Sequence, residues 1–432
     1  MNPHFHDQTS RRNFLKTSAV IGGALISPLG FSSSAAANNE TLKVGLIGCG
    51  GRGTGAASQA LNADKNVILT AMADVFSGSL SNSLNALKKE NADKVKVEPD
   101  HCFIGLDGYQ KVIDSGVDVV ILTTPPGFRP QHLKAAVEAG KHVFCEKPVA
   151  TDGPGIRSVL ASVEEVKKKK LALVAGFCWR YNNAERALFQ QIHSGAIGDI
   201  RAMYGTYYTG PVKPMPSASA RPADMSDVEW QVRNWYNFGW LSGDGLVEQA
   251  VHAVDWLAWA MKDVPPLKCV AVGGRQIPAQ GGNIYDHFEI NYEYADDVRA
   301  FLGCRQQSNC ASDNTATFYG TKGIARELGF AGMPFVKGEK NWRFAGERPD
   351  MYQIEHNELF ASIRSGDPIN NGVRLAHSSL MAIMGRMAAY TGQEITWDMA
   401  LNSQESLVPE NLRWDAALPV KPMALPGQTK FI

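Results

Sequence analysis

The sequence predicts an α/β fold whose N-terminal half is built around a doubly wound parallel sheet. Three short apolar runs, 42–47, 67–73 and 117–122, are continuous rather than alternating, as expected for strands that are buried on both faces. Segments of helical character, such as 54–61 and 131–139, lie between or after these runs. Strands that alternate with helices favour a parallel sheet, so the observations together predict this fold class.

Length and charge limit the function. The chain has 432 residues, which suggests two domains after removal of a leader. Basic and acidic residues balance at 43 each, so no net charge attracts the chain to nucleic acid or to an anionic membrane. Seven cysteines show no CxxC pair and no metal-ligand spacing, and only Cys304 and Cys310 are placed for a local disulfide. We therefore expect a small ligand, no nucleic-acid partner and no metal.

Residues 1–37 have the three-part order of a signal peptide. Arg11 and Arg12 precede Phe14, a mildly apolar stretch follows at 19–31, and a run of alanines ends at Ala37. The arginine pair resembles the twin-arginine export signal, which the export machinery reads as an address. The apolar stretch is too short to span a membrane, and no second run of spanning length occurs. We expect a periplasmic or otherwise exported protein, the alternative being a disordered tail with a chance arginine pair.

A glycine-rich turn directly follows the first predicted strand and opens a helix. This is the context that a GxGxxG pattern needs to predict a dinucleotide site, with the pyrophosphate at the helix N-terminus. Asp74 ends the second strand about 20 residues later, where a carboxylate accepts hydrogen bonds from the ribose. No arginine directly follows Asp74, which favours NAD over NADP, although Asp74 could also be a simple turn residue. The turn residues assigned to the cofactor are Gly48, Gly50, Gly51, Arg52 and Gly53.

The ends of later strands add further candidates, because ligands of such sheets lie at the carboxyl ends of the strands. Run 117–122 leads into Thr123, Thr124 and Pro125, and run 142–145 leads into Glu146, Lys147 and Pro148. A lysine beside a cationic nicotinamide in a closing cleft should have a lowered pKa, useful for general acid–base work. The alternative is a surface lysine that pairs with Glu146. The expected cofactor contacts here are Thr123, Thr124, Pro125, His132, Glu146 and Lys147.

The chain resembles the Gfo/Idh/MocA oxidoreductase family. The resemblance is carried by the glycine turn 48–53, by the GKHVFCEKP stretch 140–148, by 176–181, by 248–255 and by the C-terminal stretch 355–397. It implies an NAD-binding Rossmann domain at 38–180. It also implies an α+β domain at 181–432 with a large, open, mostly antiparallel sheet, for substrate and oligomerisation. The lysine of the EKP motif, Lys147, would face the reacting carbon and assist proton transfer.

A second cluster follows from a predicted helix that begins near Leu246. Glu248 and His252 are four residues apart on one face, and a carboxylate beside a histidine raises its pKa towards the range of a proton shuttle. The family usually has Asp where this chain has Glu248, which leaves open whether Lys147 or His252 is the main proton carrier. His252 could also be an ordinary helix histidine.

Substrate contacts are expected from two further stretches. Arg180 and Asn182 follow the last strand of the first domain and could reach cofactor or substrate. The stretch 207–240 reads as a long irregular loop rich in proline and aromatic residues, which could stack on a sugar or simply pack the loop. The substrate-binding candidates are Arg180, Asn182, Tyr236, Trp240 and Asp244.

These features predict an NAD-dependent dehydrogenase of a sugar or glycoside secondary alcohol, with C3 of glucosides as one target. The alternative is an NAD-dependent glycoside hydrolase of the same fold. The Thr-His motif of that subgroup is replaced here by 241–244 (LSGD). A non-catalytic NAD-bound sensor would not need Lys147, Glu248 and His252 together. Because free NAD is scarce outside the cytoplasm, we expect a bound, internally recycled cofactor, and the exposed sheet face suggests a homo-oligomer.

Overall fold

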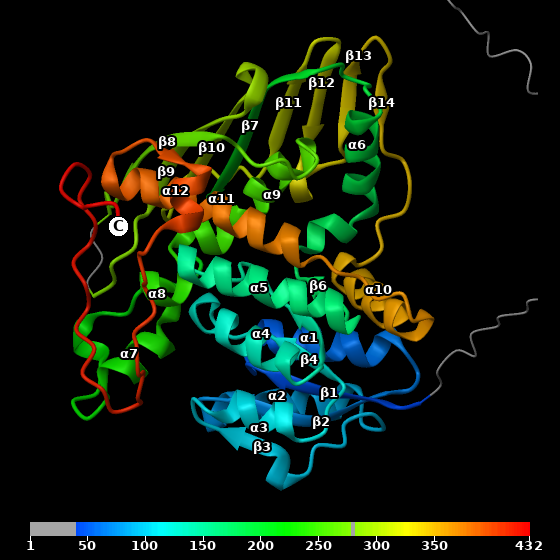
Figure 1. Cartoon of the computed structure of the whole chain (residues 1–432), viewed down its shortest axis with the longest axis vertical. Coiled ribbons are helices and arrows are strands. Elements are labelled where there is room, and N and C mark those ends of the chain that lie inside the picture. Colours follow the sequence, from blue (N-terminus) through cyan, green and yellow to red (C-terminus); the bar gives the residue numbers. More distant parts are fainter. Residues whose placement is uncertain (1–39, 278–280) are drawn as a thin grey trace, which may run out of the picture. The chain divides into compact units, whose positions relative to one another are not determined.

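A six-stranded parallel sheet forms the lower part of the molecule in Figure 1. The computed structural model describes residues 40–277 and 281–432, so the predicted leader lies outside the described residues. The strand order β3-β2-β1-β4-β5-β6 reverses direction between β1 and β4, which is the switch point where such sheets bind ligands. The strands are β1 (Leu42–Ile47), β2 (Val67–Asp74), β3 (Cys102–Ile104), β4 (Val119–Leu122), β5 (His142–Cys145) and β6 (Leu173–Ala175).

Helices connect these strands, and all the pairings between the strands are parallel, as the sequence predicts. The best-formed helix is α5, because Asp152 caps its first turn through Gly155 N–H and three lysines occupy its last turn. The helices are α1 (Gly51–Ala63), α2 (Ser77–Glu90), α3 (Gly108–Asp114), α4 (Arg129–Glu138) and α5 (Gly153–Lys169).

The second sheet has nine strands in the order β14-β13-β12-β11-β7-β10-β9-β8-β15. Only β7 and β10 pair in parallel, so the expected large, mostly antiparallel sheet is confirmed. Its strands alternate: in β9, Phe288, Ile290 and Tyr292 are buried. The strands are β7 (Ile200–Thr209), β8 (Lys268–Gly274), β9 (His287–Glu293), β10 (Arg299–Gln306), β11 (Ala316–Gly320), β12 (Gly323–Glu327), β13 (Phe335–Gly338), β14 (Trp342–Arg343) and β15 (Ile395–Thr396).

Helices cover one face of this second sheet and join it to the first. In Figure 1, α9 and α11 lie between the two sheets, and contacts of α10 with α1 and of α11 with α5 complete the junction. One hydrophobic core therefore runs through both sheets, and residues 38–432 form one compact unit. The helices are α6 (Asn183–His193), α7 (Asp227–Arg233), α8 (Gly239–Ser242), α9 (Val251–Ala260), α10 (Met351–Ser365), α11 (Gly372–Thr391) and α12 (Trp397–Asn402).

One expectation about local structure is wrong. The stretch 207–240 is partly regular, because β7 continues to Thr209 and α7 forms behind an N-cap at Ser226. Cys304 and Cys310 do not form a disulfide, since Cys304 is buried in β10 while Cys310 is exposed, and both are free thiols. Within the described residues, no helix combines the length and apolar character needed to cross a membrane.

Candidate functional site

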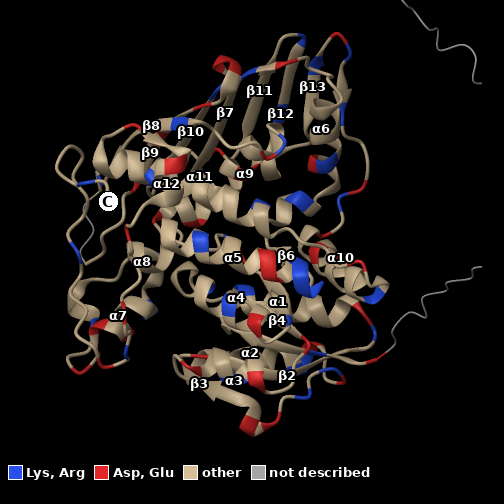
Figure 2. Cartoon of the chain, in the orientation of Figure 1, with Lys and Arg blue, Asp and Glu red and all other residues tan. Residues whose placement is uncertain are grey.

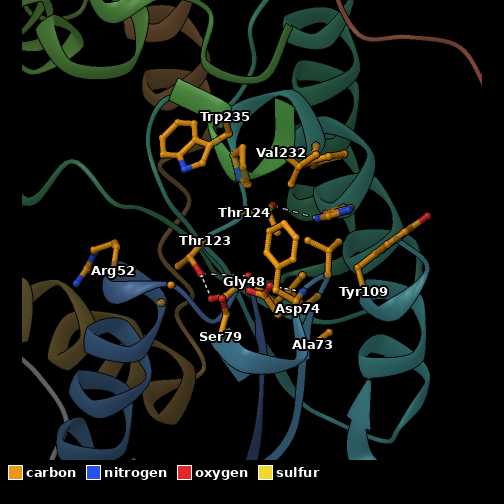
Figure 3. A pocket seen from close by; sticks show the side chains of 18 of the residues that line it. Gly48, Arg52, Ala73, Asp74, Ser79, Tyr109, Thr123, Thr124, Val232 and Trp235 are labelled. Carbon is orange, nitrogen blue, oxygen red and sulfur yellow. Dashed lines mark hydrogen bonds between the residues drawn. The ribbon is translucent and has the colours of Figure 1, made fainter. Parts of the chain in front are cut away.

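A cavity of about 490 Å³ lies at the carboxyl ends of β1, β2 and β4 (Figure 3), the position that the winding of the sheet predicts for a ligand. Its walls come from both halves of the chain. The first half supplies Ile47, Gly48, Gly50, Gly51, Arg52, Gly53, Ala73, Asp74, Val75, Phe76, Ser79, Gly105, Leu106, Tyr109, Thr123, Thr124, Pro125, Phe128, Arg129 and His132, and the second supplies Lys213, Val232, Arg233 and Trp235.

The glycine turn fits the pyrophosphate of a dinucleotide. Gly48 has a φ of +97°, and a Cβ on Gly53 would lie 1.9 Å from the Gly48 carbonyl oxygen, so both positions require glycine. A Cβ on Gly50 or Gly51, in contrast, would meet nothing within 4 Å. The turn therefore leaves open space in front of the N-terminus of α1, where backbone N–H groups can bind phosphate oxygens.

Asp74 ends β2 and faces this space. Its carboxylate accepts hydrogen bonds from Cys49 N–H at 2.7 Å and from Phe76 N–H at 2.8 Å. Burial raises the pKa of Asp74 above its usual value, and the backbone donors oppose that shift. Each oxygen keeps a lone pair for a ribose hydroxyl, so the donor and acceptor set fits NAD.

The loop after β4 forms the next part of the wall. Thr123 Oγ1 donates to Gly48 O at 2.7 Å, which fixes this loop to the glycine turn, and Thr124 Oγ1 lies 3.2 Å from His132 Nδ1. The His132 ring stacks on Tyr109 with a centroid separation of 4.1 Å. Burial, with a smaller contribution from the charge of Arg129, lowers the pKa of His132 to about 3, so the imidazole is neutral. Pro125 also lines the cavity.

Arg52 and Glu146 bind each other. Arg52 Nε donates to Glu146, and Arg52 Nη2 donates to Glu355 Oε1 at 2.8 Å. Figure 3 shows the Arg52 side chain apart from the other labelled residues. The Arg52 backbone borders the cavity, but its guanidinium is held by two carboxylates, and Glu146 is absent from the lining. Glu146 and Lys147 both lie outside the lining, so their contact with the cofactor stays a prediction, and the carboxylate of Glu146 links the glycine turn to the loop that carries Lys147.

The structure brings Lys147 and Glu248 together from residues far apart in the chain. Lys147 Nζ donates to Glu248 O at 2.6 Å and to Glu248 Oε1 at 3.2 Å, and both side chains are at most 10% exposed. Glu248 lies in the single π-helical turn Leu246–Ala250 that leads into α9. Lys147 and Glu248 do not line the cavity themselves; their link to its wall runs through Arg129, which lines the cavity and donates to the carbonyl of Pro148, the residue after Lys147.

His252 completes this cluster from the first turn of α9. Its ring lies 6.2 Å from that of Phe177 and 6.4 Å from that of Tyr207, measured between centroids. Burial, followed by the positive charge of Lys147, lowers its pKa well below the usual value. This is opposite to the raised pKa expected from Glu248, because Glu248 binds Lys147 and leaves His252 without a charge partner. The imidazole is therefore neutral.

Arg180 and Asn182 do not reach the site. Arg180 is buried and forms ion pairs with Asp255 at 2.8 Å and with Asp263 at 2.5 Å, so its charge is neutralised inside the protein. Asn182 is the N-cap of α6, where its side chain accepts from Ala184 N–H at 2.9 Å. Both side chains hold the second domain together, which corrects the expectation of cofactor or substrate contacts.

The other substrate candidates are also buried, and their side chains bind other residues of the protein. Asp244 has no exposed surface and accepts hydrogen bonds from Gly245 N–H, Tyr285 N–H and the Tyr390 hydroxyl. Burial raises the pKa of Asp244 to about 6. Trp240 Nε1 donates to Gln231, and the Tyr236 hydroxyl accepts from Gln306. These contacts shape the second domain behind the cavity, and none of the three candidates lines it.

The sequence did not identify four residues that line the cavity from the second half of the chain: Lys213, Val232, Arg233 and Trp235. They lie in the aromatic stretch that could either contact a sugar or simply pack the loop. The abundance of aromatic residues was the available signal, but their position over the first domain depends on the tertiary fold.

Comparison with known proteins agrees with this geometry. The chain is 29% identical over 341 residues to inositol 2-dehydrogenase of Salmonella paratyphi B, which covers 76% of this chain and 88% of that protein. It is 28% identical over 209 residues to a glycosyl hydrolase family 109 protein of Solibacter usitatus, which covers 45% of this chain and 44% of that protein. A levoglucosan dehydrogenase solved with NADH and levoglucosan shares the fold, with a TM-score of 0.63, 20% identity and coverage of 82% of this chain and 99% of that one.

Two family models match consecutive parts of the chain. Residues 42–177 match the oxidoreductase family with an NAD-binding Rossmann fold, and residues 186–326 match the C-terminal domain of the same family. The first match covers the glycine turn, Asp74 and Lys147, and the second covers Glu248 and His252. The chain therefore belongs to the Gfo/Idh/MocA family of NAD-binding oxidoreductases.

Proposed function

We propose that this protein is an exported NAD-dependent oxidoreductase that oxidises a secondary alcohol of a sugar or glycoside, with C3 of a glucoside as the first candidate. The observation that carries the proposal is the pairing of Lys147 with Glu248, linked through Arg129 to a cavity whose glycine turn and Asp74 fit NAD. The similarity to an inositol 2-dehydrogenase supports a polyhydroxylated ring as substrate.

Bound NAD supplies the acceptor for the hydride of the alcohol carbon. Glu248 takes two of the three N–H groups of Lys147 Nζ, which leaves the third for the substrate oxygen. The ammonium group then stabilises the negative charge that develops on that oxygen. The neutral imidazole of His252 offers a lone pair to the hydroxyl proton, although burial and the charge of Lys147 lower its pKa and so weaken it as a base. Lys147 therefore holds charge in this scheme, and His252 moves the proton.

Export and cofactor retention belong to the same proposal. The arginine pair at residues 11 and 12 supports the twin-arginine route, which carries folded proteins with their cofactors. Outside the cytoplasm, a released NADH would not be replaced. The cofactor therefore stays bound, and a second sugar or a keto-sugar restores it.

The test is to purify the exported protein without added nucleotide and to record its absorbance in the reduced-nicotinamide band during addition of glucosides and keto-glucosides. A band that rises and falls with substrate, with the glycosidic bond intact, supports the proposal. The similarity to a glycosyl hydrolase family 109 protein makes glycoside cleavage the second candidate. Cleavage without net change in the band would establish that function instead. Protein without bound nucleotide would overturn cofactor retention.

We also propose that the protein forms a homo-oligomer through the outer face of the nine-stranded sheet. Val270, Val272 and Tyr319 are 46%, 68% and 45% exposed there, and the middle of β7 and of β11 carries no charged residue (Figure 2). A sheet face that exposes apolar side chains is a candidate subunit interface. A Val272→Lys variant should lower the mass measured by light scattering, and an unchanged mass would contradict this interface.

A further inference from the structure

The cavity is closed on one side by a part of the chain that does not belong to the Rossmann domain. Lys213, Val232, Arg233 and Trp235 line it opposite Asp74 and Phe76, and Figure 3 shows Val232 and Trp235 above the Asp74 side of the cavity. Asp74 marks the place of the adenosine ribose of NAD. The added wall therefore covers the adenosine half of the cofactor site.

A C-terminal segment, residues 407–418, packs against this wall and forms hydrogen bonds with it. Ser226 Oγ donates to Trp414 O at 2.6 Å, Leu418 N–H donates to Asp227 Oδ2 at 2.9 Å, and Gln231 Nε2 donates to Leu418 O at 2.6 Å. All three contacts attach α7 to residues 414–418. They join a separate hydrophobic cluster in which α7 and α8 pack against side chains from residues 407–418.

The wall and the C-terminal segment also contact the Rossmann domain at Phe76, two residues after Asp74. The Arg233 guanidinium lies over the Phe76 ring at 4.2 Å, and the Trp414 ring meets its edge at 5.7 Å. Edge-to-face aromatic pairs and cation–π contacts both stabilise the packing of the groups that they join.

From these contacts we infer that α7 and residues 407–418 form an adenosine enclosure, which must open before NAD can leave. The enclosure makes dissociation slow without adding a hydrogen bond to the nucleotide. This inference deepens the proposed function, since it rests on NAD as the retained cofactor. Trp414 is a positioning residue here, because it acts on the cofactor through Phe76, whereas Arg233 both contacts Phe76 and lines the cavity itself.

The test measures the release of NADH from the loaded protein by the decay of its fluorescence after addition of excess NAD. Trp414→Ala removes the edge contact with Phe76, and Arg233→Ala removes the contact over the ring. Arg233 is 46% exposed, so its replacement is compatible with folding. The matched control is Trp342→Ala in β14, a half-buried tryptophan that does not line the cavity.

We expect both variants to release NADH at least tenfold faster than the wild type, and Trp342→Ala to release it at the wild-type rate. Release at the wild-type rate from both Trp414→Ala and Arg233→Ala would overturn the enclosure. This readout does not involve substrate. A protein that fails to oxidise sugars but shows the faster release would refute the proposed function and support the enclosure.

Discussion

Two buried glutamates should make the stability of this protein fall as pH rises. Glu185 in α6 and Glu327 at the end of β12 are both fully buried. Neither oxygen of Glu185 has a donor among the described residues, so only a proton held between the two carboxyl groups can join them. The nearby Arg348 donates instead to the carbonyls of Gly329 and Gly332. Burial first, and then the partner's charge in the case of Glu185, raises the pKa of each carboxyl.

The size of this pH dependence follows from one proton that the folded state retains and the unfolded state loses. A carboxyl whose pKa is raised by folding contributes stability that is complete below its unfolded pKa, near 4.3, and is lost as pH rises towards its folded pKa. In that window the folded state binds one proton more than the unfolded state. The free energy of unfolding then falls by about 1.4 kcal/mol per pH unit, or about 3 kcal/mol between pH 6 and pH 8.

Glu185→Gln should remove this dependence, because the amide donates to Glu327 without a titrating proton. The assay is urea unfolding of both proteins at pH 6, 7 and 8, with Glu339→Gln at an exposed glutamate as the control. The difference in unfolding free energy between variant and wild type should shift by about 3 kcal/mol in favour of the variant from pH 6 to pH 8. A difference that stays constant with pH would refute the reasoning, as would an equal shift in the control.

Three further predictions concern the site and its support. Lys147→Met should lower kcat about 100- to 1,000-fold while the nucleotide stays bound, as judged by turnover and by the absorbance of the bound nucleotide; a loss under tenfold would contradict its role. Gly53→Ala should lower the melting temperature, since its Cβ has no room, whereas Gly50→Ala should melt as the wild type does but copurify with less nucleotide. Equal nucleotide content in Gly50→Ala and wild type would contradict the assignment of the open space. Arg180→Met leaves Asp255 buried without its cation, so urea unfolding should show a free energy of unfolding about 3–5 kcal/mol lower than that of the wild type. Steady-state kinetics should show an unchanged KM. A raised KM in folded protein would show that Arg180 belongs to the site after all.

Local patterns in the sequence were enough to predict the Rossmann half. The glycine turn, Asp74 and the strand ends are defined by short-range signals, and the structure places them around one cavity. Arg180 shows where such reasoning ends. Its place after a strand suggested a ligand contact, but Asp255 and Asp263 approach it from more than seventy residues away and neutralise it.

The same limit applies to His252 and to the adenosine enclosure. Glu248 and His252 are four residues apart in the sequence, but the partner of Glu248 is Lys147, 101 residues earlier in the chain. No local sequence pattern shows which positively charged side chain will pair with a given carboxylate in the folded protein. The contacts of Phe76 with Arg233 and Trp414 likewise join three distant segments, so they follow from tertiary packing alone.

The support that Trp414 gives to Phe76 has a consequence for how the protein is made. A ribosome synthesises the whole parallel sheet, including the glycine turn and Asp74, long before it adds residues 407–418. The proposed adenosine enclosure therefore predicts that a nascent chain exchanges nucleotide with its surroundings until the last-made segment packs onto α7. On this prediction, the nucleotide that a finished molecule carries comes from the pool in which its translation ended.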